Sequence, residues 1–267
     1  MQEFDSAEII KTIVLPKKIN ETSGLEFYAK NFITHNDSGD GPSLYIFNEN
    51  GNLIKTMDLN KDSSFEIENN DWEDIAGDDK YLFVADTGNN FGNRDNLNII
   101  RVSKDDNYSV DGIMEVFYAD QETFFPRPKH KYDAEALIVI NDQLVLFSKD
   151  RENLNTDLYL VDKFEKKPQK LTSEFAFNVN SLITGGDYNN ELNLLALVSY
   201  NSKGSQYLIL FERFDLKNLE ENTFKKYTIP LERAQIESIK IIDKNTFWVT
   251  SEDEGIGNPY MYKLKVK

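Results

Sequence analysis

The chain has 267 residues, of which 40% are hydrophobic and 28% charged, and this composition is typical of one large globular domain. Its 30 Lys and Arg residues are outnumbered by 46 Asp and Glu, and the net charge of −16 disfavours nucleic acid and anionic membrane surfaces as general partners. The absence of cysteine excludes disulfides, thiolate zinc sites and cysteine nucleophiles, and only two histidines are present.

The N-terminal residues, MQEFDSAEII, lack the basic and then apolar pattern of a signal peptide. No apolar run approaches the roughly 18 residues that a transmembrane helix needs. Two settings fit this start, a cytoplasmic protein and a chain cut just after an export signal.

Short runs of β-branched and aromatic residues, bounded by Asn, Asp and Gly, recur along the chain and predict an all-β fold. The runs form five similar units, and each unit opens with a polar residue that leads an apolar strand. The openings are Ser23–Leu25, Glu73–Ile75, Glu135–Leu137, Asn180–Leu182 and Glu237–Ile239. Second strands are expected at 32–37, 82–86, 144–149, 195–199 and 247–251, and third strands at 44–47, 97–102, 158–161, 207–211 and 260–264. Fourth strands are expected at 53–57, 114–118, 169–172 and 224–229, and the one expected helical turn or two lies near 216–222.

The fifth unit runs out of chain after its third strand, whereas residues 9–15 form an apolar strand with no partner in their own unit. Successive openings are 45 to 62 residues apart, and the residues from Glu237 to the end plus those before Ser23 number 53. The sum of 53 falls within the range of the other spacings, so the two chain ends together make up one unit. The sequence therefore predicts a single domain, 1–267, folded as a five-bladed β-propeller with four antiparallel strands per blade, in which the N-terminal strand closes the last blade. The alternatives are a six-bladed propeller and a β-sandwich.

The blade openings place five polar residues around the central channel on the face with the long loops, and we expect any binding site on that face. These residues are Ser23, Glu73, Glu135, Asn180 and Glu237. Three converging carboxylates repel one another, by about 4 kcal/mol for a pair ~4 Å apart, unless they are protonated, paired or metal-bound. Oxygen ligands of this charge suit Ca²⁺ best and Mg²⁺ less well. The alternative is that they bond backbone amides and hold adjacent blades together.

A group of basic residues is predicted over blades two and three on the same face. It comprises Arg94, Arg127, Lys129, His130, Lys131, Lys149 and Arg151. Such a patch, with Asp86 and Asn90 beside it, is suited to a small anionic ligand that carries a carboxylate, phosphate or sulfate. The alternative is that these residues pair with nearby Asp and Glu as surface charges.

The segments Asn70–Ala76, Val84–Asn90 with Arg94, and Tyr132–Leu137 followed by Lys149 resemble motifs of exported bacterial β-propeller proteins related to the SdiA-regulated group. This resemblance implies an extracytoplasmic setting, periplasmic, surface or secreted, and names no activity. More distantly, the order of polar residues at the five openings is similar to that of calcium-activated nucleotidase, a five-bladed propeller whose channel holds Ca²⁺. That resemblance implies Ser23, Glu73, Glu135, Asn180 or Ser181, and Glu237 as calcium ligands.

No nucleophile, base and orienting group can be assembled from these motifs, so the sequence assigns no catalytic residue. We therefore expect a metal-stabilised, monomeric propeller that binds a small ligand or an envelope or extracellular partner on its long-loop face. The alternative is a Ca²⁺- or Mg²⁺-dependent hydrolase of a small anionic phosphoester or lactone-type substrate. The sequence does not decide whether the protein is an enzyme.

Overall fold

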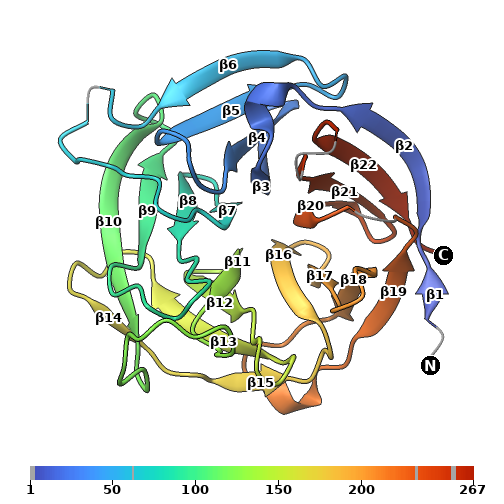
Figure 1. The fold of residues 1–267 in the computed structure, drawn as a ribbon. Coiled ribbons are helices and arrows are strands. Elements are labelled where there is room, and N and C mark those ends of the chain that lie inside the picture. The colour runs from blue at the N-terminus through green and yellow to red at the C-terminus, as the bar shows by residue number, and fades with distance from the viewer. Residues whose placement is uncertain (1–3, 62, 232–233, 254–256) are drawn as a thin grey trace.

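The computed structural model describes residues 4–61, 63–231, 234–253 and 257–267. Five antiparallel sheets stand in a ring around a central channel (Figure 1), so the predicted five-bladed propeller is confirmed.

Each blade is built mainly from strands that are consecutive in the chain. Blade one comprises β3 (Thr22–Tyr28), β4 (Asn31–Asn36), β5 (Ser43–Phe47) and β6 (Leu53–Asp58). Blade two comprises β7 (Asp74–Gly77), β8 (Tyr81–Asp86), β9 (Asn98–Ser103) and β10 (Ser109–Tyr118), with β14 (Gln169–Leu171) added at its outer edge. Blade three comprises β11 (Ala134–Ile140), β12 (Gln143–Ser148), β13 (Thr156–Asp162) and β15 (Phe175–Phe177). Blade four comprises β16 (Leu182–Asn189), β17 (Leu194–Tyr200), β18 (Gln206–Glu212) and β19 (Lys225–Ile229), with β1 (Asp5–Ser6) added at its edge. Blade five comprises β20 (Ile236–Asp243), β21 (Thr246–Ser251), β22 (Tyr260–Lys265) and β2 (Glu8–Val14).

The ring closes as the sequence predicts. Strand β2 pairs antiparallel with β22, with Val14 opposite Tyr260, and so supplies the fourth strand of blade five. The sequence did not predict that β1 pairs in parallel with β19 of blade four. The N-terminal segment therefore joins blades four and five as well as completing the last sheet.

The expected fourth strand of blade three is wrong. Residues Gln169–Leu171 form β14, which pairs in parallel with β10 of blade two, and β15 takes the fourth place in blade three. Phe177 in β15 packs edge-on against Phe211 of blade four, with ring centroids 5.0 Å apart. Strand β15, which contains two phenylalanines, thus fills the space between blades three and four.

Two short 3₁₀ helices accompany the strands. One is η1 (Lys17–Ile19), which the sequence did not indicate. The other is η2 (Leu219–Glu221), a single turn inside the expected 216–222 segment.

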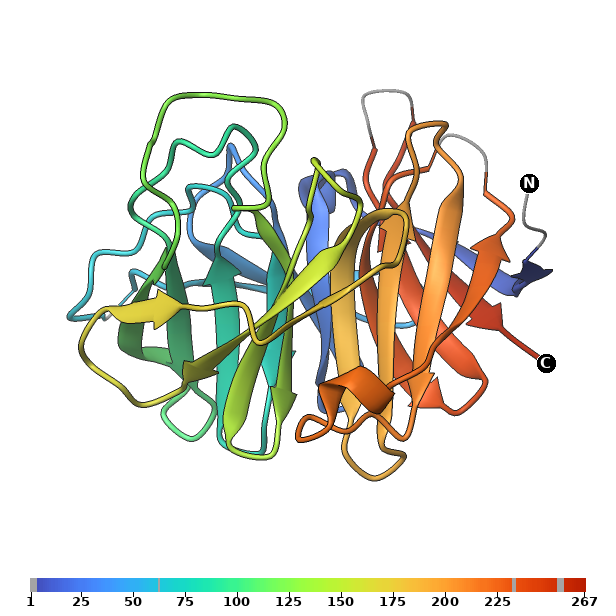
Figure 2. The ribbon, with the colours of Figure 1, turned by 90° about the horizontal axis from the view of Figure 1, so that it is seen from below.

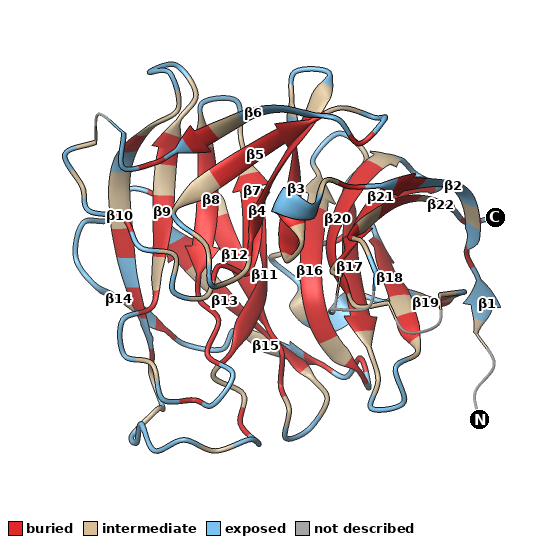
Figure 3. Cartoon of the chain, turned by 45° about the horizontal axis from the view of Figure 1, so that its top comes forward, coloured by how far each residue is buried: buried red, intermediate tan, exposed pale blue. Residues whose placement is uncertain are grey.

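The hydrophobic core is divided among the blade interfaces. Figure 3 shows buried residues along the inner strands of every blade, and five apolar clusters fill the spaces between neighbouring blades. Trp72, for example, is fully buried between blades one and two and donates its indole N–H to the Glu68 carbonyl at 3.1 Å. Each blade is therefore stabilised by both of its neighbours.

The innermost strands line the channel, and polar side chains fill its deeper part. The Asp74 carboxylate accepts backbone N–H groups from Ile75, Leu137 and Gly186 at 2.8, 2.9 and 3.1 Å, and so joins blades two, three and four. Further along the strands, the Lys240 ammonium bonds both Glu26 and Asp187 at 2.8 Å. Each of these deeper carboxylates is therefore bonded by a backbone donor or by a cation of the protein.

Candidate metal centre

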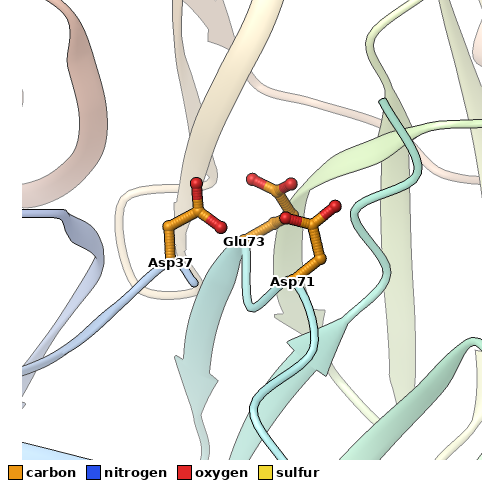
Figure 4. Close-up of side chains that lie close together, drawn as sticks. All are labelled: Asp37, Asp71 and Glu73. Carbon is orange, nitrogen blue, oxygen red and sulfur yellow. The ribbon is translucent and has the colours of Figure 1, made fainter. Parts of the chain in front are cut away.

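Three carboxyl groups point toward one another at the mouth of the channel on the long-loop face (Figure 4). Asp37 directly follows β4, and Asp71 and Glu73 lie just before β7, so the group spans blades one and two. One oxygen from each residue lies within 4.8 Å of the others. Oxygens on opposite sides of a Ca²⁺ ion are about 4.6–5.2 Å apart, because each Ca–O distance is about 2.3–2.6 Å. We call these three residues the mouth cluster.

A glycine lets the neighbouring loop approach the mouth cluster closely. A Cβ atom on Gly88, in the loop after β8, would collide with the carboxyl groups of both Glu73 and Asp71. The Gly88 carbonyl also accepts an N–H of Arg94 at 2.6 Å, which fixes this part of the loop. A larger residue at this position would have to displace the carboxyl groups of Glu73 and Asp71.

The environment of the mouth cluster favours proton uptake when no cation is present. Burial, together with the charge of Asp71 and a hydrogen bond shared with it, raises the pKa of Asp37 to about 9. Burial also raises the pKa of Asp71, and burial and the charge of Glu135 raise that of Glu73 well above its usual range. Three carboxylates this close need either shared protons or a bound cation.

A second acidic group shares Glu73 with the first, and its other two members are paired with cations of the protein. Oxygens of Glu73, Asp133 and Glu135 also lie within 4.8 Å of one another. However, Lys149 bonds Glu135 at 2.8 Å, and Arg151 forms an ion pair with Asp133 and lies 3.7 Å from Glu135. Although burial disfavours the charged form of Lys149, the charges of Glu135 and Glu237 raise its pKa well above the usual range. Glu135 thus has cationic partners that the mouth cluster lacks at bonding distance among the described residues.

Glu237 is a buried carboxyl group, 3% exposed, whose charge acts on Lys149. Neither of its oxygens makes a hydrogen bond of normal geometry within the described ranges, although the Gln235 side chain lies close enough to lower its pKa. Burial dominates and raises the pKa of Glu237 well above its usual range.

The register of the inner strands shows which expected opening residues are equivalent. Glu135, Thr184 and Glu237 each occupy an irregular position at the start of β11, β16 and β20. Thr184, and not Asn180, is therefore the residue of blade four that matches the glutamates. The sequence pointed to Asn180 because it does not reveal the shift in register. Asn180 is exposed before β16, with a φ of 50°.

Two hydroxyl groups hold adjacent blades at these positions. Ser23 donates to the Glu73 carbonyl at 2.5 Å, and Thr184 donates to the Ile236 carbonyl at 2.5 Å. The hydroxyl group of Ser181, the residue after Asn180, bonds the Ser199 hydroxyl group at 2.9 Å. Ser23 thus has the blade-joining hydrogen bond that was the alternative to metal ligation.

Most of the basic group that the sequence indicated is paired with acidic residues. Arg94 bonds Asp86 at 2.8 Å, and Lys149 bonds Glu135. Burial lowers the pKa of His130, whose Nε2 lies 3.2 Å from the Asn90 carbonyl oxygen. In the described part of the chain, only Arg127 and Lys129 of this group combine a positive charge with no carboxylate partner, and Arg127 lies 5.3 Å from the Tyr132 ring centroid.

Sequence reasoning missed Asp37, Asp71 and Asp133 as members of the site. A usable signal is present, because Asp71-Trp-Glu73 and Asp133-Ala-Glu135 repeat the pattern Asp-x-Glu at two successive blade openings. In an extended segment, residues two apart point to the same side, so both carboxyl groups face the mouth. Asp37 has no such repeat in the sequence, and only the fold brings it beside Asp71.

No protein-family model matches the chain, and comparison with curated proteins finds no match either. Solved structures with a similar fold include an exo-β-1,3-galactanase from Clostridium thermocellum, at a TM-score of 0.61 and 12% identity. That alignment covers 96% of this chain and 63% of the galactanase chain. A β-1,3-galactosidase has a TM-score of 0.52 and 11% identity, with 97% and 94% of the two chains covered. A chain of the mitotic checkpoint complex has a TM-score of 0.50 and 9% identity, with 100% and 94% covered.

At these identities the similarity supports the propeller fold and nothing more specific. The resemblances to the SdiA-regulated group and to calcium-activated nucleotidase stay predictions from motifs. Among the described residues, no helix is long and apolar enough to cross a membrane.

Proposed function

We propose that the protein is a divalent-cation-stabilised binding module, with Ca²⁺ held at the channel mouth by Asp37, Asp71 and Glu73. The observation that carries this proposal is the convergence of the three carboxyl groups within 4.8 Å, with no cation of the protein bonded to them in the described chain. A bound Ca²⁺ relieves the mutual repulsion that otherwise raises their pKa values. This ligand set replaces the one expected from the blade openings and keeps only Glu73 from it.

The ligand set favours Ca²⁺ over Mg²⁺. All of its donors are carboxylate oxygens, and they come from two separate loops, which accommodates an irregular coordination shell of six to eight oxygens. Three carboxylates leave coordination positions for water or for hydroxyl groups of a ligand. Open sites of this type have dissociation constants of about 0.1–1 mM in extracellular modules, and this agrees with the extracytoplasmic setting that we retain in the proposal.

The paired state of the basic residues changes the expected ligand. Arg94, Lys149 and Arg151 are all bonded to carboxylates, so a small anion would have to break these pairs and enter a mouth rich in acidic groups. A neutral ligand avoids that penalty. We therefore replace the anionic ligand of the sequence-based hypothesis with a neutral one.

The second candidate is a hydrolase. The observation in its favour is that the mouth holds both Asp37, whose pKa is raised, and Glu135, which is bonded to Lys149. The raised pKa of Asp37, about 9, keeps it protonated at neutral pH without a cation. Glu135, which Lys149 bonds at 2.8 Å, belongs to the second acidic group, which shares Glu73 with the group that contains Asp37. Acid–base hydrolysis requires a proton donor and a proton acceptor in one site, and two structures of similar fold are named as a galactanase and a galactosidase. Turnover of glycoside, phosphoester or lactone substrates that is lost in Asp37→Asn would support this candidate, and no turnover with any of the three would reject it.

The test of the proposed function is thermal unfolding of chelator-treated protein with and without 10 mM Ca²⁺. At 10–100 times the dissociation constant, binding to the native state adds about 1.4–2.7 kcal/mol, which corresponds to roughly 3–10 °C in the melting temperature. Asp71→Asn should abolish most of this rise, and Asp95→Asn, an exposed residue in the β8–β9 loop, is the control with the same charge change. An equal rise in both variants would contradict the proposal.

A further inference from the structure

A half-open groove lies between the β6–β7 loop and the two outer strands of blade two, β9 and β10. Its volume is about 520 Å³. Figure 1 and Figure 2 show the β6–β7 loop passing beside these strands at the outer side of the ring. We call this cavity the outer groove, and it is separate from the mouth cluster.

Carboxylates and apolar side chains line the outer groove. Glu66 and Glu68 come from the β6–β7 loop and Glu115 from β10, and these three exposed residues form no ion pair with a described residue. Ile113 and Phe117 of β10 line the same groove, and Phe117 is 44% exposed. No Lys, Arg or His among the described residues lines it. The groove therefore suits a ligand with several positive charges on a frame that also offers apolar contact.

A single metal ion is not the occupant that this arrangement favours. Within the described chain, the acidic groups compact enough for one ion are the two at the channel mouth, and Glu66, Glu68 and Glu115 belong to neither. Their charges are spread over two walls of the groove. Separate ammonium or guanidinium groups along an extended ligand can approach such carboxylates one at a time.

The wall formed by the β6–β7 loop is held in place by hydrogen bonds. Ile67, between the two glutamates, is 3% exposed. Its N–H donates to the Asn60 side chain at 2.7 Å, and its carbonyl accepts from the same side chain at 2.9 Å. The Trp72 indole donates to the Glu68 carbonyl at 3.1 Å. The carboxylates thus stand on a bonded segment, and little ordering is needed when a ligand binds.

Beside the outer groove, the outer edge of β10 is only partly covered. β14 pairs with the last three residues of β10, and no described strand pairs with the outer edge of residues 109–115. The Val116 N–H bonds the Leu97 carbonyl at 3.0 Å on the side of β9. Successive N–H groups point to opposite edges of a strand, so those of Ile113 and Glu115 point to the outer edge. Open edges of this kind are templates for another strand.

We propose that the outer groove and the open edge of β10 together bind an extended, basic segment of a partner protein. The segment adds as a strand beside β10, and its Lys or Arg side chains on one face reach Glu66, Glu68 and Glu115. Ile113 and Phe117 lie two residues before and after Glu115, so they share its face of β10 and contact the stems of these side chains. This site goes beyond the proposed function, because it needs no cation at the channel mouth.

The experiment uses a fluorescein-labelled peptide of nine alternating Thr and Lys residues and measures fluorescence anisotropy at low ionic strength. Binding is expected, and it should weaken as salt is added. A control peptide with Glu in place of each Lys should not bind. A second control, with Pro in place of each Thr, keeps every positive charge but disfavours strand pairing, and should bind at least ~10-fold more weakly. Equal affinity for the Lys–Thr and Lys–Pro peptides would overturn the proposal.

The variant that tests the groove is Glu66→Gln/Glu115→Gln. Loss of these two charges should weaken binding of the Lys–Thr peptide about 3- to 10-fold. Glu191→Gln/Glu220→Gln is the matched control, because both residues are exposed and neither lines the groove. An equal loss of affinity in the two double variants would assign binding to the net charge of the protein and would overturn the proposal.

Amide hydrogen exchange measured by NMR locates the bound peptide. Exchange at Ile113 and Glu115 should slow in the complex, because the added strand takes up their N–H groups. Protection at other amides and not at these two would contradict strand addition. Spermine, a small organic polycation, should compete weakly, and spermine affinity equal to that of the peptide would assign the groove to a different ligand and overturn the proposal.

The outcomes separate this inference from the proposed function. EDTA should leave binding of the Lys–Thr peptide unchanged at temperatures at which the protein stays folded. Calcium binding without peptide binding overturns the inference alone, and peptide binding without calcium binding overturns the proposed function alone. Peptide binding that requires Ca²⁺ would overturn the independence of the two sites.

Discussion

Asp74 shows how a single side chain can connect three blades. Its carboxylate accepts three backbone N–H groups from blades two, three and four, and it is 1% exposed. The carboxylates of Glu26 and Asp187, further along the channel strands, are already bonded to Lys240.

We predict that Asp74→Ala lowers the free energy of unfolding by at least about 3 kcal/mol, because it leaves three buried N–H donors without acceptors. For a chain of this length, the melting temperature should fall by roughly 6–12 °C. Urea unfolding gives the free energy directly. Asp243→Ala is the control, since that exposed carboxylate accepts one N–H at a turn, and its loss should change the free energy by less than about 1 kcal/mol. Equal effects of the two substitutions would refute the role assigned to Asp74.

At the scale of the element, the N-terminal strand β2 completes blade five through residues far away in the sequence. Its partner β22 contains Met261 and Leu264, which are fully buried, and Tyr262, which is 8% exposed. Removing β2 would leave the outer edge of β22 without hydrogen-bond partners, and open edges of this kind pair with other chains.

We predict that deletion of residues 1–15 gives aggregated or poorly folded protein, measurable by size-exclusion chromatography and circular dichroism. Among the described strands, deletion of residues 1–6 removes only the two-residue β1, and it should leave a soluble folded protein. Retention of the parent melting temperature after the longer deletion would contradict closure by β2.

The elements that the sequence predicted well are those with a strong local pattern. The inner and second strands combine apolar residues with turns at regular spacing, and the blade count follows from their repetition. β14 and β15 were predicted less well, because both are three residues long and their assignment depends on which neighbouring blade offers a partner. Thr184 was missed for a related reason, since a register shift in β16 is not visible in the amino-acid pattern.

For the whole molecule, the central result is the separation of two kinds of acidic group along one channel. The deeper carboxylates are bonded by backbone N–H groups or by Lys240, whereas Asp37, Asp71 and Glu73 at the mouth have no cation at bonding distance in the described part of the chain. The sequence predicted carboxylates at the channel and their face, because blade openings repeat. It could not predict that Asp37 approaches Asp71, nor that Lys149 bonds Glu135, since both contacts join residues that are separated in the sequence and brought together only by the fold.

The most direct test of cation binding is an anomalous difference map from crystals grown with Ca²⁺ and measured at long wavelength. The proposed function predicts one strong peak per chain among the carboxyl groups of Asp37, Asp71 and Glu73, with Ca–O distances of about 2.3–2.6 Å. The absence of a peak there, at a calcium concentration of 10 mM or above, would show that these three groups share protons instead, and it would contradict the account.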